Sequence, residues 1–526
     1  MALIVNPLGD FPLNDDWAYA QNVFQLAEKG TFYLSDWPAM TLIVHTLLGY
    51  LFAKVFGFSF IVLRLSVWLL GLVALVSFYQ LIKQLNASKA IMFITAFCLA
   101  LNPLFFLHSF SFMTEISFLA MFLLALRCYS RFFITCELKF IFWGSFFSLL
   151  ATMIRQPGIL LPVAFLIGYL VSGKWEQKPL LIMFVALIII TGALIGWPMI
   201  LQHYDMLPGS YSSIQDLIAH VNRPGFLYSL FFRTSMLLIY FGIFLLPVSV
   251  LIFWTLWNQL NKTGRIVAIS VSVIAVSAVV INISHFPAGN VFYNMGLGPK
   301  VLKDTYWNVN VRPVFPDSVL LLKYILGIAG AFLFAFNLMA VILKLGFKKP
   351  AGPLNRINLF IIALAAGYIV FLFSGKYFFD RYYLPLLPLV LILMITSARI
   401  RTRKFPLAIS IAVLGLIAWF SIAATHDYFA WNRARWAGLN HLLKSGETPS
   451  NIDGGFEFNA WYDTGELNPL DRQGKSWWFV DNDSFAVTFG KWPGFETDTT
   501  ILFFSYLTLK PDSIFILKKE PPVVAE

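Results

Sequence analysis

Residues 179–201, PLLIMFVALIIITGALIGWPMIL, contain no charged side chain over a length that crosses the hydrocarbon core of a bilayer. The rest of the 526-residue chain has the same character, because 59% of its residues are hydrophobic and 12% are charged. Soluble proteins carry roughly 25% charged residues. A chain with so little polar surface neither covers a soluble core nor remains disordered. The composition therefore predicts an integral membrane protein.

Twelve apolar segments of this kind are predicted to be transmembrane helices, each close to the 20 or so residues that a span requires. Two of them, 138–155 and 158–172, are short and are separated by Arg155-Gln156-Pro157-Gly158. Proline and glycine interrupt a helix, so this pair is either a tight hairpin or one broken helix. The twelve segments are 59–83, 90–107, 113–134, 138–155, 158–172, 179–201, 229–257, 266–284, 318–344, 356–374, 382–399 and 405–424.

Lysine and arginine concentrate in one alternating set of the connecting loops, and the positive-inside rule places that set in the cytoplasm. The net formal charge of +11 thus reports topology, and nucleic acid is not an expected partner. The loops of this set contain Lys83, Lys89, Arg127, Arg131, Lys139, Lys174, Lys178, Lys262, Arg265, Lys344, Lys348, Lys349, Arg356, Arg399, Arg401, Arg403 and Lys404. The outer side then holds residues 1–58, 202–228, 285–317, 375–381 and 425–526.

Met1 to Asp16 have neither the basic start nor the apolar run of a signal peptide, although the first 58 residues are predicted to cross the membrane. Because they are predicted to lie outside, we expect a further helix upstream of this reading frame, or 59–83 acting as a reverse anchor. A chain without that helix is the alternative. Apolar spacing predicts one helix near 18–27, stopping near Gly30, and one over 40–56 that lies in the membrane interface.

The C-terminal segment is predicted to be a small extracytoplasmic α+β domain. An amphipathic helix over 427–444 ends near Gly446, and short β-like runs follow at 456–458, 477–480, 484–488, 501–504 and 513–517. The predicted fold is an all-α polytopic membrane protein with about 12 spans, external juxtamembrane helices and this domain. Its divisions are the external segment 1–58, the transmembrane domain 59–424 and the C-terminal domain 425–526.

Two acidic sites are predicted on the outer side. The adjacent carboxylates Asp15 and Asp16 precede a helix, and Glu115 opens an apolar helix about one turn inside. Capping of a helix N-terminus is one explanation of each site. The other is a general base or a cation-binding pair, which the presence of two acidic sites on one membrane face favours.

Basic and aromatic residues gather on the same predicted side. Arg155 ends a span, while Lys376 and Arg381 lie outside against the bias of the other loops. Snorkelling or interfacial anchoring would make them structural. A guanidinium fork also matches phosphate oxygens, so phosphate binding is the functional alternative. Tyr382 falls in the aromatic belt and His285 at the outer mouth, as rim residues.

These motifs, in this order, resemble the GT-C superfamily of membrane glycosyltransferases, most closely the dolichyl-phosphate-mannose protein mannosyltransferase and aminoarabinose transferase group. The similarity covers about residues 10–425. In the group, a helix precedes the first acidic loop, and this chain shows no such helix. The second residue of the acidic pair is Asp16 here, in place of a glutamate. The matching residues are Asp15, Asp16, Tyr19, Phe56-Gly57-Phe58-Ser59, Arg64-Leu65, Glu115, Arg381, Tyr382, Pro385 and Pro388, and beyond them Asp427-Tyr428 and Gly454-Gly455-Phe456-Glu457 resemble the tails of some bacterial members.

The resemblance implies a multi-pass protein of the cell inner membrane that moves a hexose or pentose from a polyprenyl-phosphate donor to an acceptor at the outer face, with inversion. The acceptor is a glycan, a lipid or a protein. Members of the superfamily differ in their metal requirement, so Mg²⁺ or Mn²⁺ held by Asp15 and Glu115 is left open. The implied residues are Asp15, Asp16 and Glu115 for catalysis, Arg381, Lys376 and Arg155 for the donor phosphate, and Tyr19, Tyr382 and His285 for the substrate pocket.

Two other functions are kept as alternatives: a transporter or flippase of a lipid-linked substrate, and a polymerase of lipid-linked glycans. Transporters place charged or broken helices near the midplane, whereas the charges here cluster at one rim. The glycosyltransferase prediction requires that Asp15 and Arg381 converge at one site beside the outer leaflet.

Overall fold

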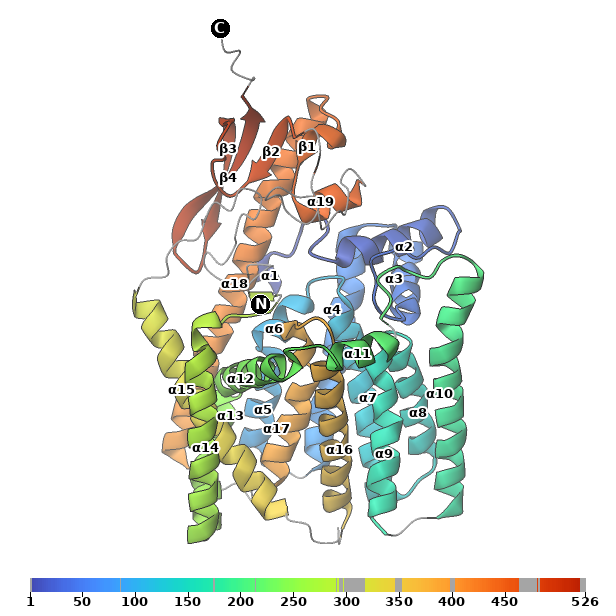
Figure 1. Cartoon of the computed structure of the whole chain (residues 1–526), viewed down its shortest axis with the longest axis vertical. Helices are drawn as coiled ribbons and strands as arrows, with labels where there is room; N and C mark the ends of the chain where they lie inside the picture. The colour runs from blue at the N-terminus through green and yellow to red at the C-terminus, as the bar shows by residue number, and fades with distance from the viewer. Residues whose placement is uncertain are drawn as a thin grey trace.

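A computed structural model describes residues 2–85, 87–173, 176–212, 214–289, 291–292, 297, 317–345, 352–397, 403–462, 480 and 483–520. Helices make up most of it, and a small sheet lies at one end (Figure 1). The protein is a mostly helical, multi-pass membrane protein, as the composition predicts. The predicted strand at 477–480, apart from Val480, and the basic residues Lys174, Lys348, Lys349, Arg399 and Arg401 lie outside the described residues.

Eight helices within the described ranges are long and apolar enough to cross a bilayer. Their outward faces carry exposed aliphatic side chains such as Ile188, Ile274 and Leu416, as expected for surfaces in lipid. The helices are α4 (Phe60–Gln84), α7 (Thr114–Thr135), α10 (Gln177–His203), α12 (Phe226–Phe244), α14 (Lys262–Asn282), α15 (Asp317–Leu345), α16 (Pro353–Ser374) and α18 (Lys404–Lys444).

Shorter helices occupy the remaining predicted spans. The single span predicted over 90–107 is wrong, because α5 ends at Ala100 and α6 begins at Pro103. The single span predicted over 229–257 is wrong: α12 ends at Phe244 and α13 begins at Leu246. Pro247 explains the break, because proline lacks the amide needed to continue a helix but fits its first turn. The shorter helices are α1 (Ala2–Val5), α5 (Lys89–Ala100), α6 (Pro103–His108), α8 (Lys139–Thr152), α9 (Leu160–Val171), α11 (Ile214–Val221), α13 (Leu246–Gln259) and α17 (Leu386–Ser397), with 3-10 turns η1 (Gln156–Ile159), η2 (Ile283–His285), η4 (Asp380–Tyr383) and η5 (Pro449–Asn451).

The segment Arg155-Gln156-Pro157-Gly158 forms a tight turn between α8 and α9. A side chain at Gly158 would lie 2.3 Å from the backbone nitrogen of Thr152, so the turn packs directly on the end of α8. Arg155 itself is extended (φ −147°, ψ 134°), which ends the helix and directs its side chain away from the α8 ladder. The tight-hairpin alternative is therefore the one observed.

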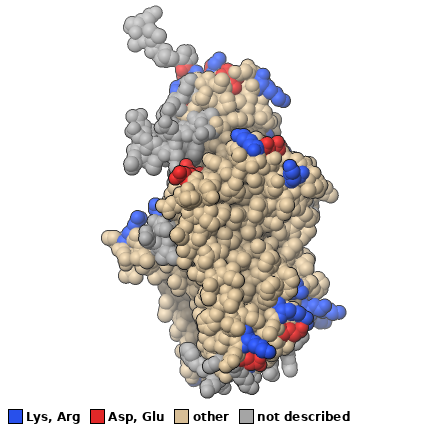
Figure 2. All heavy atoms as spheres, turned by 90° about the vertical axis from the view of Figure 1, so that its right-hand side faces the viewer, with Lys and Arg blue, Asp and Glu red and all other residues tan. Residues whose placement is uncertain are grey.

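The face of the helical part that Figure 2 shows has an apolar belt. Figure 2 shows a broad band without lysine, arginine, aspartate or glutamate between charged side chains at both ends. The C-terminal ends of α9 and α15 and the N-terminal ends of α10 and α16 lie at the lower end in Figure 1, and the sheet lies at the upper end. The basic loops and the C-terminal sheet are therefore on opposite sides of the belt.

Two helices precede the first long span. α2 (Asp16–Glu28) and α3 (Ile43–Phe56) match the two helices predicted in this region, and Gly57 follows α3 with a φ of +83°. They lie at the upper end of the molecule, beside the upper end of α10 (Figure 1). Their place in the membrane interface stays a prediction.

The C-terminal region is built on α18, which continues through the predicted domain boundary at 424/425 for 41 residues in all. Its upper part carries a four-stranded sheet in the order β1-β2-β4-β3. A side chain on Gly438 of α18 would touch Ile501 and Ile516 at 3.2–3.3 Å, so glycine lets the sheet lie close to the helix. The strands are β1 (Ile452–Asp453), β2 (Phe485–Thr488), β3 (Phe495–Ser505) and β4 (Lys510–Lys519).

The strand predicted at 456–458 is wrong, because these residues open the short helix α19 (Phe456–Trp461). Alternating Phe-Glu-Phe suggested a strand. In the fold, Phe458 is buried, Glu457 is also largely buried through polar contacts, and the preceding Gly455 has a φ of +85°. Tertiary contacts thus override the local pattern.

We expect Gly330→Val to destabilise the protein where α12 and α15 cross. A Cβ at Gly330 would lie 2.6 Å from the carbonyl carbon of Gly242, a backbone atom that cannot rotate away. Overpacking of this kind costs about 1–3 kcal/mol. Gly415→Val in α18, which has no neighbour within 4 Å, is the matched control. Thermal unfolding of the detergent-purified variants measures the effect, and equal melting temperatures for the two would contradict it.

Candidate active site

Four charged side chains from four distant parts of the chain meet at the upper end of the membrane helices. The Arg381 Nη2 lies 2.9 Å from Asp15 Oδ2, across 366 positions of sequence, and its Nε lies 3.1 Å from Glu115 Oε1. Arg155 Nη1 donates to the same Glu115 oxygen at 2.7 Å. The predicted convergence of Asp15 and Arg381 is confirmed.

These four residues, which we call the ion-pair cluster, are withdrawn from water. The side chains of Arg381 and Glu115 are 4% and 3% exposed, and those of Asp15 and Arg155 are both 13% exposed. Two carboxylates face two guanidinium groups, so the cluster is balanced in charge. Burying such charges costs several kcal/mol per ion unless each is paired and hydrogen-bonded, a requirement that the shared oxygen of Glu115 helps to meet.

Aromatic rings enclose both guanidinium groups. The ring of Tyr382 lies 4.7 Å from the Arg155 guanidinium carbon and 5.7 Å from that of Arg381. The ring centroid of Phe379 lies 4.8 Å from the guanidinium carbon of Arg381. These contacts orient the arginine planes and reduce their access to water, which strengthens the charge interactions inside the cluster.

Neither acidic residue of the cluster serves as a helix cap. Asp15 occupies the position before α2, but its side chain makes no capping hydrogen bond and instead accepts from Trp37 Nε1 at 3.0 Å. Glu115 lies in the first turn of α7, where its partners are the two arginines. Helix capping therefore does not account for Asp15 and Glu115.

Asp16 has a different environment from its neighbour. Its carboxylate accepts the backbone N–H of Leu13 and, at 3.2 Å, that of Phe112, just before α7. It is fully buried, and burial raises the pKa of its carboxyl to about 7. Asp16 thus ties the first loop to the beginning of the helix that carries Glu115.

Buried polar contacts also hold the segment around Arg381. Asp380 accepts the N–H groups of Val291 (2.8 Å), Phe292 (3.2 Å) and Arg381 (2.9 Å). Arg233 of α12 donates to the carbonyls of Phe373 and Gly375, at 3.1 and 2.6 Å, where α16 ends. A cation at a helix C-terminus is favourable, so Arg233 stabilises the turn that leads to Arg381.

The remaining predicted site residues divide by position. Tyr19 is buried, and burial beside Asp15 raises the pKa of its phenol well above the ordinary value. Tyr382 contacts both arginines, as described above. Lys376 and His285 are exposed; their nearest ring contacts are Tyr377 at 5.1 Å and Phe232 at 6.0 Å, and the structure does not bring them into the ion-pair cluster.

Sequence reasoning missed Trp37 and Arg233. An arginine inside a predicted span, such as Arg233, is itself a signal of a functional or buried polar contact. Trp37 carries no such signal, because nothing in its neighbourhood predicts that its indole will donate to Asp15. Only the tertiary contact identifies it.

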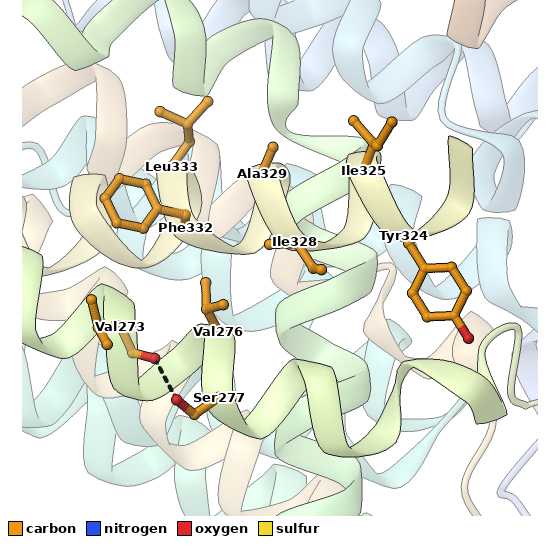
Figure 3. A pocket seen from close by; sticks show the side chains of 9 residues that line it. All are labelled: Val273, Val276, Ser277, Tyr324, Ile325, Ile328, Ala329, Phe332 and Leu333. Atoms are coloured by element: carbon orange, nitrogen blue, oxygen red, sulfur yellow. Dashed lines mark hydrogen bonds between the residues drawn. The ribbon is translucent and has the colours of Figure 1, made fainter. Parts of the chain in front are cut away.

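An apolar groove lies on the side of the helical bundle, between α14 and α15. Figure 3 shows its lining, in which the hydroxyl of Ser277 donates to the carbonyl of Val273 at 3.0 Å. The groove has a volume of about 630 Å³ and contains no ionisable group other than the phenol of Tyr324. Its chemistry suits an apolar chain. None of the four residues of the ion-pair cluster lines it.

The family comparison matches residues 41–197 to a model described as dolichyl-phosphate-mannose-protein mannosyltransferase. This stretch includes Glu115 and Arg155 of the cluster. The match confirms the resemblance that the ordered motifs predicted.

Over that stretch the chain is similar to membrane mannosyltransferases.

Two solved structures are similar to this chain: the crystal structures of ArnT from Cupriavidus metallidurans in the apo state and bound to undecaprenyl phosphate. Their sequences are 14% and 13% identical to this chain. Each match covers 98% of this chain and 96% of the other, with a TM-score of 0.44. No curated protein matches the chain.

Metal binding by Asp15 and Glu115 stays a prediction. Among the described residues, no three histidine, cysteine, aspartate or glutamate side chains form a group that could hold a metal ion. Both carboxylates contact the guanidinium of Arg381, which already places a positive charge between them. The mechanism considered below requires no step through a metal.

We expect Glu115→Gln to destabilise the protein strongly. The substitution leaves two buried guanidinium groups with one carboxylate, and breaking a buried pair costs about 3–5 kcal/mol. Glu137→Gln removes an exposed contact with Lys139 and is the control, for which little change is expected. Thermal unfolding in detergent gives the comparison, and a control that loses as much stability as Glu115→Gln would refute the role of burial.

A second prediction concerns pH. Because the pKa of Asp16 rises from 3.8 to about 7 on folding, the folded state retains a proton that the unfolded chain releases between these values. Its stabilising contribution is full below pH 3.8 and is lost as the pH rises to 7. The melting temperature of the wild type relative to Asp16→Asn should therefore fall from pH 4.5 to 7.5. Asp36→Asn, at an exposed position, is the control; a flat difference for Asp16→Asn would contradict this.

Proposed function

We propose that this protein is a glycosyltransferase of the GT-C type, which moves a sugar from a polyprenyl-phosphate donor to an acceptor hydroxyl at the outer face of the membrane and inverts the anomeric carbon. The observation that carries the proposal is the contact of Arg381 with both Asp15 and Glu115 at one end of the membrane helices. A carboxylate able to take a proton and a cation able to hold a phosphate are then within one ionic contact of each other.

The proposed reaction is a single displacement. The acceptor oxygen attacks the anomeric carbon, its proton passes to the Asp15 carboxylate, and the bond between that carbon and the phosphate oxygen breaks with its electron pair on the phosphate. Attack opposite to the leaving group inverts the anomeric carbon. The products are the glycosylated acceptor and the polyprenyl phosphate.

The pairing of Asp15 with Arg381 supports this sequence of charge changes. When Asp15 accepts the proton it loses its negative charge, and the positive charge of Arg381 becomes available to the leaving phosphate. Arg155 supplies a second guanidinium, oriented by Glu115 at 2.7 Å. Charge that develops on the phosphate therefore meets cations that are already in place.

The other predicted residues enter the proposal with roles that fit their positions. Tyr19 and Tyr382 are assigned to the substrate pocket; Tyr382 contacts both arginines of the cluster. The exposed Lys376 and His285 are assigned to the rim, where the donor or the acceptor enters. Asp16 is assigned to holding the loop that carries Asp15, because its oxygens accept backbone N–H groups.

The donor class is suggested by the family description, which names dolichyl-phosphate-mannose. A lipid phosphate keeps the sugar at the membrane surface, the level at which an apolar belt meets a charged cluster. We propose a glycan, a lipid or a protein as the acceptor, and the sugar is a hexose or a pentose.

The proposed topology has twelve spans in the cell inner membrane, with the basic loops in the cytoplasm. The cluster, residues 1–58 and the C-terminal region 425–526 then lie outside, around a transmembrane domain of residues 59–424. The basic connections and the sheet lie at opposite ends of the helices, which supports this orientation.

We expect Asp15→Asn to abolish sugar transfer while the protein remains folded. An amide cannot accept the proton, and loss of a general base lowers rates by about 100-fold or more. The assay measures transfer of labelled mannose from polyprenyl phosphomannose to an added acceptor extract by the detergent-purified protein, with the corresponding glucose and arabinose donors as further substrates. Asp36→Asn, an exposed carboxylate of the same external segment, should retain activity.

Full activity of Asp15→Asn would refute its role as the base. Movement of the lipid-linked sugar across liposomes without sugar transfer would favour a flippase instead. A ladder of products on a gel would identify a polymerase.

A further inference from the structure

The segment Gly454-Gly455-Phe456-Glu457 lies in the C-terminal region, yet it contacts the loop that carries Asp15. One carboxylate oxygen of Glu457 accepts the backbone N–H of Asn14 at 3.1 Å, across 443 positions of sequence. Asn14 is the residue directly before Asp15. The C-terminal region is thus one peptide unit away from the proposed base.

Glu457 is itself held in place. Its other oxygen accepts from Arg435 Nη2 at 2.8 Å, and the Arg435 Nε donates to the carbonyl of Gly454 at 2.9 Å. Glu457 and Arg435 are 8% and 6% exposed. Because both oxygens of the carboxylate are engaged in a largely buried place, its position relative to Asn14 is well defined.

The glycines of the segment permit this arrangement. Gly455 has a φ of +85°, and a side chain there would lie 3.1 Å from the Arg435 Nη2. A side chain on Gly454 would lie 2.5 Å from the ring of Phe458. The Gly-Gly pair lets the chain turn tightly into α19 while Arg435 stays in contact with Glu457.

A second contact from the same segment reaches Asp15 by another route. The ring of Phe456 lies 5.6 Å from that of Trp37, whose indole donates to the second oxygen of Asp15. Earlier in the first loop, the ring of Phe11 stacks on that of Trp436 of α18, with ring centroids 6.0 Å apart. The C-terminal region therefore contacts both the backbone before Asp15 and one of its side-chain partners.

The backbone at Asn14 gives this contact its consequence. Asn14 has a φ of +52°, a conformation that L residues rarely adopt without support. Holding its N–H fixes the direction in which the chain enters Asp15, whose carboxylate must then reach Arg381 at 2.9 Å. A base displaced by about 1 Å loses about 100-fold in rate.

We propose that Glu457, held by Arg435, is a positioning residue that sets Asp15 for proton transfer through the backbone of Asn14. This inference rests on the proposed function, in which Asp15 is the base. It makes the C-terminal region a part of the catalytic unit, joined to the first loop by defined polar contacts.

The test compares Glu457→Ala, Glu457→Gln and the exposed control Glu496→Gln in full-length, detergent-purified protein. Labelled polyprenyl phosphomannose is the donor, and hydrogen exchange of the peptide covering residues 6–16 is measured in parallel. Glu457→Ala should lower kcat about 10- to 100-fold and leave the KM for the donor within about twofold, because Arg381 and Arg155 are unchanged. Glu457→Gln keeps an acceptor for the Asn14 N–H and should restore most of the activity.

Exchange in residues 6–16 should rise in Glu457→Ala and not in Glu496→Gln, with the β3–β4 peptides unchanged. Wild-type kcat and wild-type exchange in Glu457→Ala would overturn the proposal. A rise that extends over the whole sheet, without rescue by glutamine, would also overturn it, since that is general destabilisation. If the wild type transfers no sugar, the proposed function fails, and the exchange of residues 6–16 still decides whether Glu457 holds the loop.

Discussion

The guanidinium of Arg381, shared by Asp15 and Glu115, is the interaction on which the upper half of this molecule depends. Three charged groups at 3–13% exposure are tolerable only if each remains paired. Most of the surrounding architecture serves that condition. Asp380 and Arg233 fix the segment before Arg381, Asp16 fixes the first loop against the start of α7, and aromatic rings cover the arginine faces.

The same constraint links two parts of the chain that the sequence presents as separate. The external first segment contributes the carboxylate, and the C-terminal region contacts the backbone beside it. The helix α18 is continuous from Lys404 to Lys444, and its upper part packs against the sheet. It therefore connects the C-terminal region to the bundle through one uninterrupted helix. Movements of the sheet relative to the cluster are thereby restricted, which a reaction needing two aligned groups requires.

Charge balance also connects structure and chemistry. The cluster pairs two carboxylates with two guanidinium groups, so a phosphate entering it must replace or neutralise a carboxylate. In the proposed reaction, proton transfer to Asp15 does this at the moment when the leaving group acquires charge. The apolar groove between α14 and α15 contains no such charges, so it and the ion-pair cluster suit different parts of a lipid-linked substrate.

The sequence by itself determined the class of the molecule. Uninterrupted apolar segments, basic loops on one side and acidic and basic motifs on the other follow from the thickness and polarity of a bilayer, which every span must satisfy locally. Most helix positions were predictable for that reason. The helix at Phe456 was not, since it depends on contacts with other elements. The break at Leu245 has a local cause in Pro247, which the predicted span 229–257 overlooked.

Only the tertiary structure decided which ionisable residues act together. Asp15 and Asp16 are adjacent and chemically equal in sequence, but one faces Arg381 and the other accepts backbone N–H groups. Lys376 and Arg381 share one short turn, yet one is exposed and the other buried. The direction in which a side chain points depends on contacts across hundreds of residues, and local patterns carry no information about those contacts.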